Sequence, residues 1–135
     1  MHTLETELKR VVLVRLNSGD DILLSIRQAV EKHGIESGVI LTGVGSVSRY
    51  HVHVVETTRL PPGDVFVEWE GPYDVLSVTG LIIDGRVHAH ITLSDTDKAV
   101  GGHLEEGCRV LTFAAVVIGE TPNTALTDWD QIGGL

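Results

Sequence analysis

The spacing of apolar residues changes several times along this chain, and each change predicts a different element of structure. The aliphatic run 11–14 predicts a strand over residues 9–16, since branched aliphatic side chains favour extended backbone. The polar segment 17–20, Asn-Ser-Gly-Asp, ends that strand. Residues 22–30 then carry apolar side chains at the three- and four-residue spacing of one helix face, which predicts an amphipathic helix.

Both ends of this helix carry their own signals. Asp20 or a close neighbour is placed to accept hydrogen bonds from the first free backbone N–H groups. Lys32 and His33 fall in the last turn, where positive charge is favourable. Gly34 can take the left-handed conformation that stops a helix, so the pattern predicts one main helix that ends just before it.

Strand patterns fill most of the chain beyond this helix. Residues 38–47 are apolar and glycine-rich, which indicates a bulge or a close approach of the backbone. Residues 48–56 alternate more clearly between apolar and polar side chains. After a proline- and glycine-containing loop at 59–64, two further strands are predicted at 66–69 and 73–83.

A hairpin is the clearest local signal among these strands. Asp84-Gly85 is a two-residue turn that pairs residues 75–83 with residues 86–93. Glu70-Gly71-Pro72 is expected to break the strand region before it, and residues 109–118 form the last predicted strand. Strands that follow one another through short turns pair antiparallel, which argues against a doubly wound parallel sheet.

These elements predict an α+β fold, with one main helix against a mainly antiparallel sheet of six to eight strands. We expect a single compact domain over residues 1–135, with its core at about 9–120. The tail at 121–135 is polar and irregular, and it is expected to drape over the surface or to pack Trp129 on a neighbour.

Composition narrows the classes of protein that this chain can represent. The formal net charge of −9 opposes a general attraction to nucleic-acid phosphates, and the Lys and Arg residues are scattered. No apolar run approaches the roughly 20 residues of a membrane span. The acidic start lacks the order of a secretion signal, and Cys108 is the single cysteine, so we expect a cytoplasmic protein.

Three histidines close together are the strongest chemical signal. His88 and His90 stand two residues apart on a predicted strand and therefore share one face. His103 follows after a turn, and Gly101-Gly102 would let its backbone come close to the pair. Three neutral imidazoles with one open position suit zinc or another divalent transition metal, with room for a small ligand.

Other candidate residues have two interpretations each. A second His-x-His pair, His51 and His53, points either into the same cavity or out from an exposed polar face, and we favour the exposed face. Cys108 is close to His103 in sequence but is expected to be a packing residue. Asp74 and Glu70 are either solvated or carboxylates that support the site. Neither the glycine segment 43–45 nor Ser46 fits a phosphate-binding or nucleophile motif.

The same histidines take part in a family resemblance. Four ordered motifs carry it: Leu41-Thr42-Gly43-Val44-Gly45-Ser46, Gly71-Pro72-Tyr73-Asp74-Val75-Leu76-Ser77-Val78-Thr79-Gly80, His88-Ala89-His90-Ile91-Thr92-Leu93-Ser94-Asp95 and Gly101-Gly102-His103-Leu104. Together they resemble the PPC domain, the plant-and-prokaryote-conserved domain, from about Val11 to Glu120.

The resemblance implies a compact domain around an antiparallel sheet that assembles as a homotrimer. In plants this domain follows AT-hook motifs and mediates self-association and contact with transcription factors. Prokaryotic members are single-domain proteins, of which some are labelled predicted DNA-binding proteins and some hold a zinc-type metal. The metal ligands of those members match His88, His90 and His103 here.

This sequence departs from the plant pattern at two places. It has no Arg-Gly-Arg-Pro hook, so minor-groove binding by that device is excluded. The family's Gly-x-Phe-Glu-Ile-Leu stands here as residues 71–76, where Pro72 stiffens the start of the segment and puts plant-type partner contacts in doubt. The departure leaves the histidines unchanged.

Three functions remain open from the sequence. The first is a trimeric metal-binding domain that takes a small ligand at the metal. The second is a DNA-binding or transcription-associated protein, and the third is an interaction scaffold in which the histidines have no metal role. An enzyme would also need a positioned base and a pocket, neither of which the sequence identifies.

Overall fold

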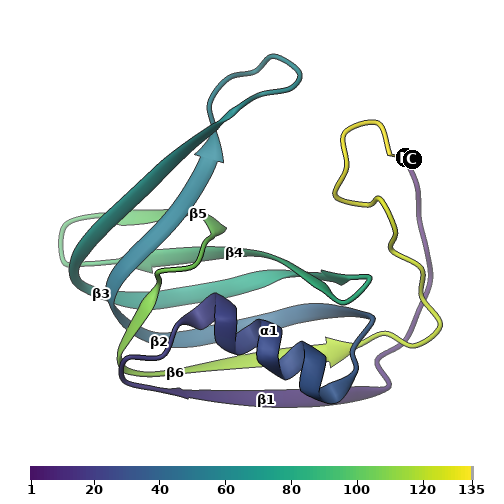
Figure 1. Ribbon diagram of the computed structural model, residues 1–135, viewed down its shortest axis with the longest axis horizontal. Coiled ribbons are helices and arrows are strands. Elements are labelled where there is room, and N and C mark those ends of the chain that lie inside the picture. The colour runs from purple at the N-terminus through teal and green to yellow at the C-terminus, as the bar shows by residue number, and fades with distance from the viewer. Residues whose placement is uncertain (135) are drawn as a thin grey trace.

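Six strands form one antiparallel sheet that curves around a single helix in the computed structural model, which describes residues 1–134 (Figure 1). In chain order the elements are β1 (Arg10–Asn17), α1 (Ile22–His33), β2 (Ser37–Val55), β3 (Asp64–Ile83), β4 (Arg86–Ser94), β5 (Ala99–Leu104) and β6 (Arg109–Glu120). The strands lie in the order β1-β6-β2-β3-β4-β5. The predicted α+β fold, with one helix and an antiparallel sheet, is confirmed.

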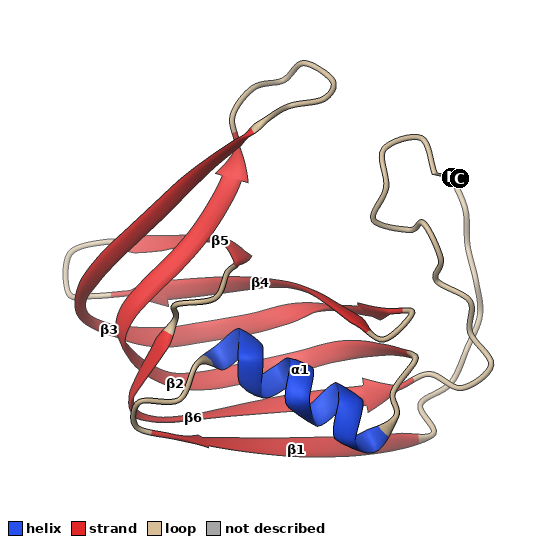
Figure 2. Ribbon diagram, viewed as in Figure 1, coloured by secondary structure: helices blue, strands red, loops and turns tan. Residues whose placement is uncertain are grey.

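Helix α1 covers one face of the sheet and closes the core (Figure 2). Asp21, the neighbour of Asp20, is its N-cap, and the carboxylate accepts from the backbone N–H of Leu24 at 3.1 Å. Gly34 ends the helix at a φ of 61°, as its position predicted. Ile26 faces the sheet with no exposed area, so the helix contributes its apolar face to the core.

Neither of the two longest strands is interrupted, although the sequence predicted a break at residues 70–72. Both β2, with 19 residues, and β3, with 20 residues, are continuous and pair with each other along their lengths. The pairing shifts where Val47 lies opposite Tyr73 and Arg49 opposite Glu70, so Gly71-Pro72 lies in a bulge. A proline is tolerated there because no ladder bond is required of its nitrogen, and the expected break at residues 70–72 is wrong.

Strand β5 lies where the sequence predicted only a turn and a glycine-rich connection. It pairs with β4 on one side and with β2 on the other, beyond the point where β6 leaves β2. The second half of β2, together with β3, β4 and β5, therefore closes into a small ring of strands at this end of the sheet. The short strand has little hydrophobic alternation of its own, since Gly101-Gly102 occupy its middle.

Residues 121–134, the described part of the C-terminal segment after β6, contain no helix or strand but are held at defined points. Thr121 donates its backbone N–H to the carbonyl of Ser37 at 3.0 Å, and Leu126 is buried. The hydroxyl of Thr127 donates to Asp84 in the β3–β4 turn at 3.1 Å. Residues 121–134 follow an irregular path, and Trp129 is 37% exposed. Among residues 1–134, no helix is long and apolar enough to span a membrane.

Candidate metal centre

Four histidine side chains gather on the solvent side of the closed end of the sheet. They are His53 on β2, His88 and His90 on β4, and His103 on β5. Between the histidines of β4, Ala89 faces the core with 1% exposure, so the imidazoles lie on the opposite face. Strand β5 runs between β2 and β4, which places His103 opposite His53 on one side and His90 on the other.

His103 is the centre of this group. Its ring centroid lies 4.4 Å from that of His53, in a stacked arrangement, and 4.8 Å from that of His88. The His90 ring is 5.5 Å away. The structure thus brings together the three residues that the sequence singled out, and it adds His53.

The expected exposed face for the second His-x-His pair is not what the structure shows. His53 retains only 19% of its side-chain exposure, because β5 brings His103 against it. His51 is also partly buried, but its Nδ1 lies 2.7 Å from the carbonyl of Glu106 rather than in the group of four. The pairing of β2 with β5 joins distant parts of the chain, which is why residue spacing did not reveal the role of His53.

The glycine pair sets the approach of β5 to both neighbours. A Cβ on Gly101 would lie 2.5 Å from the carbonyl oxygen of Ile91 on β4. A Cβ on Gly102 would lie 2.5 Å from the carbonyl oxygen of His53 on β2. Only glycine allows this approach, and His103 comes to its place between two strands because of it.

Glu105 adds a carboxylate to the histidines. Its Oε1 lies 2.6 Å from Nδ1 of His53 and 3.2 Å from Nδ1 of His103. The first contact is a hydrogen bond, whereas the second lacks hydrogen-bond geometry and leaves Nδ1 of His103 buried without a partner. A buried ring nitrogen without a partner costs free energy unless another group, such as a cation, takes its lone pair.

The surroundings favour the neutral form of the central rings. Burial lowers the pKa of His103, and the nearby rings of His53 and His88 lower it further, against the opposing charge of Glu105. Partial burial and the neighbouring rings of His88 and His53 lower the pKa of His90. Because a metal binds neutral imidazole, these shifts extend the ligand form to lower pH.

The donor set fits a divalent transition metal. The ligand atoms of His53, His103 and Glu105 lie within 4.8 Å of one another, a group that includes only His103 of the three ligands predicted from the sequence. Two ligands on a tetrahedral zinc ion, each bound at about 2.1 Å, lie about 3.4 Å apart, so small side-chain rotations would close the gap. Imidazole nitrogens with a carboxylate suit zinc and its neighbours among the transition metals.

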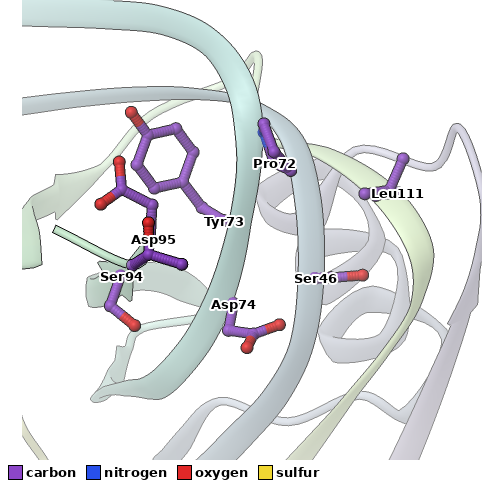
Figure 3. A pocket seen from close by; sticks show the side chains of 8 residues that line it. Ser46, Pro72, Tyr73, Asp74, Ser94, Asp95 and Leu111 are labelled. Carbon is purple, nitrogen blue, oxygen red and sulfur yellow. The ribbon is translucent and has the colours of Figure 1, made fainter. Parts of the chain in front are cut away.

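The remaining sequence candidates lie outside this group. Cys108 has no exposed area, and burial raises the pKa of its thiol to about 11, so the packing interpretation holds. Asp74 lines a separate pocket of about 360 Å³ with Ser46, Tyr73 and Ser94 among its neighbours (Figure 3). Ser94 lies four residues beyond His90 on β4. Because a strand rises about 3.3 Å per residue, this pocket is separate from the histidines.

Comparison with known families agrees with the fold and the motifs. Residues 4–122 match the model of the Plants and Prokaryotes Conserved (PCC) domain, which is the PPC domain. This chain belongs to that family. The family assignment from the sequence motifs is therefore confirmed, while the bound metal and the trimer stay predictions.

Solved structures share the fold of this PCC domain. A metal-containing protein from Archaeoglobus fulgidus has a TM-score of 0.79 at 24% identity, covering 93% of this chain and 89% of that one. A PPC protein from Pyrococcus horikoshii has a TM-score of 0.77 at 26% identity, covering 93% and 87%. A candidate DNA-binding protein from Bacteroides thetaiotaomicron has a TM-score of 0.72 at 19% identity, covering 88% and 83%.

Among curated proteins, the PCC domain is similar to part of a larger protein. It is 26% identical over 114 residues to the bifunctional protein GlmU of Synechococcus sp. strain JA-2-3B'a(2-13), a match that includes 84% of this chain. The chain spans only 17% of the length of that relative. The similarity therefore concerns one segment of the larger protein.

Proposed function

We propose that this PCC domain binds a divalent transition metal, zinc or a similar ion, through His88, His90 and His103. The observation that carries the proposal is the buried Nδ1 of His103, which has no hydrogen-bond partner at the centre of four imidazoles. The fold relative from Archaeoglobus fulgidus is described as metal-containing, which supports the same use of this fold.

Three imidazole ligands would leave one position of a tetrahedral ion for a small anionic ligand or water. A metal ion at this place would supply a positive centre that attracts such a ligand. His53, on β2, and Glu105 both lie against His103. The carboxylate of Glu105 accepts a hydrogen bond from Nδ1 of His53. We assign these two residues to support of the site or to a share in the ligand set.

Metal content after purification without added zinc tests this proposal. Wild-type protein is expected to retain close to one ion per chain, whereas His103→Ala is expected to retain nearly none. His51→Gln is the matched control, since His51 lies in the neighbouring His-x-His pair with its ring nitrogen on the Glu106 carbonyl. In a second step both proteins are supplied with zinc and the excess is removed. Equal, near-zero metal in wild type and His103→Ala after this step would contradict the proposal.

We further propose a homotrimer in which the β2–β3 hairpin is covered. Large apolar side chains stand exposed on this hairpin: Val54, Val55, Val65, Phe66, Val67 and Trp69. The ring of Phe66, 59% exposed, also lies 5.2 Å from that of His53, so a second chain on this surface would lie beside His53.

Light scattering tests the homotrimer directly. We expect three times the monomer mass for wild type and a smaller mass for Phe66→Ser combined with Trp69→Ser. A monomer at micromolar concentration, with and without zinc, would contradict this part of the proposal.

DNA binding is the alternative that the family and one fold relative bring forward. The charge of −9 and the scattered basic residues oppose it, because neutralised phosphates supply most non-specific affinity. A mixed-sequence duplex at about 50 mM salt favours detection of such binding. A stable shift under these conditions would support the alternative, and no shift would leave the metal-binding proposal as the better account.

A further inference from the structure

The C-terminal tail delivers a carboxylate to the histidine group. Asp130 lies ten residues beyond the end of β6 at Glu120, yet its Oδ2 is 3.3 Å from Nδ1 of His88. The same oxygen is 3.4 Å from the guanidinium of Arg86, and Oδ1 accepts from the side chain of Gln131 at 3.0 Å. The side chain of Asp130 is only 10% exposed, whereas those of its partners His88 and Arg86 are 37% and 58% exposed, so the carboxylate is covered at the edge of the solvent.

The tail reaches this place through contacts that are independent of Asp130. The backbone of Thr121 is hydrogen-bonded to Ser37, and Leu126 is buried. Thr127 is hydrogen-bonded to Asp84 in the β3–β4 turn. The last of these contacts lies beside the start of β4, the strand that carries His88. The position of Asp130 therefore follows from the path of the whole tail.

A carboxylate on one ring nitrogen decides which nitrogen can bind a metal. An ionised carboxylate accepts hydrogen bonds but donates none, so Nδ1 of His88 must carry the hydrogen in this contact. Nε2 then keeps its lone pair, and the ring is held in one orientation. Carboxylates placed in this way behind ligating histidines raise ligand basicity, and their loss typically weakens metal binding about 10–100-fold.

From this geometry we infer that Asp130 of the C-terminal tail is the positioning residue of His88, holding the ring with Nε2 free for a divalent metal. The inference rests on the proposed metal function for its consequence, while the Asp130–His88 hydrogen bond is itself a contact within the chain. The irregular tail thereby contributes a residue that orients a proposed metal ligand.

The test uses the full chain, first without metal and then with zinc. In ¹⁵N-labelled, metal-free protein at pH 8, the ring signals of His88 are expected to show the proton on Nδ1. Asp130→Ala is expected to move the proton toward Nε2, and to weaken zinc binding about 10–100-fold in a chelator competition. Asp130→Asn, whose amide oxygen can still accept, is expected to recover part of that affinity.

Asp128→Asn is the matched control, because Asp128 lies on the same tail without a place in the Asp130 contacts. It is expected to behave as wild type in both measurements. An unchanged His88 proton position in Asp130→Ala overturns the inference, whether or not the protein binds zinc. A changed proton position with an unchanged zinc affinity overturns it too, since Asp130 would then not prepare the ring for metal. Absence of zinc binding by wild type contradicts the proposed function instead, and the proton position then decides the positioning role alone.

Discussion

Replacement of Gly102 by alanine tests how closely the stability of this fold and the geometry of its histidine group are linked. The added Cβ would lie 2.5 Å from the carbonyl oxygen of His53 and 3.1 Å from Cγ1 of Val54. Ordinary contact begins at 3.4 Å, so the first distance is short by about 0.9 Å. The obstacle is a backbone atom of β2, which cannot rotate away, and β5 must therefore withdraw.

The expected loss of stability in Gly102→Ala follows from the contacts that hold β5 to β2. Only two residue pairs join these strands, Val52 with Leu104 and His53 with His103. Overpacking of this kind costs about 1–3 kcal/mol, and each weakened backbone hydrogen bond contributes about 0.5–1.5 kcal/mol within that range. A metal site tolerates displacements of about 0.5 Å, so the withdrawal of His103 should also weaken zinc binding by roughly tenfold or more.

Two measurements on Gly102→Ala separate these effects. Urea unfolding followed by circular dichroism should show a free energy of unfolding lower by about 1–3 kcal/mol. Zinc affinity from chelator competition should fall with it. Ile91→Val, the core residue opposite Gly102 on β4, is the control: it should cost about 0.5–1.5 kcal/mol and leave zinc affinity unchanged. Wild-type stability in Gly102→Ala would refute the close-approach reasoning, and a destabilised variant with wild-type zinc affinity would refute the link to the site.

Three further predictions concern residues outside the histidine group. Asp21→Ala removes the acceptor of two backbone N–H groups, and urea unfolding should show a loss of about 1–3 kcal/mol. Cys108 should resist iodoacetamide at pH 8 in the folded protein and react readily in urea, as mass spectrometry can follow; rapid modification of the folded protein would contradict its burial. Hydrogen bonds from the backbone N–H groups of its turn lower the pKa of Asp95, so its stabilising effect is present above the ordinary aspartate pKa of 3.8 and is lost as pH falls through the lowered value. Asp95→Ala should accordingly melt below wild type at pH 7, and the difference should shrink in melting curves recorded below pH 3.8; a constant difference at all pH values would contradict it.

Local signals carried most of the fold prediction. The helix was predictable because its cap, its apolar spacing and Gly34 all act within a few residues of one another. The Asp84-Gly85 turn likewise determined the pairing of β3 with β4. The break predicted at residues 70–72 was wrong, because Gly71-Pro72 fits a bulge once β2 and β3 pair along their lengths.

The sequence by itself determined that His88 and His90 share a face, because alternation along a strand needs no information from elsewhere. It also placed His103 near them through the resemblance and the glycine pair. Only the tertiary structure decided that His53 and Asp130 join the group. His53 meets Glu105 across 52 positions, and Asp130 meets His88 across 42. Contacts between residues so far apart in sequence depend on how β5 and the tail pack against distant strands. Neither segment has a periodic apolar pattern from which its position could be predicted.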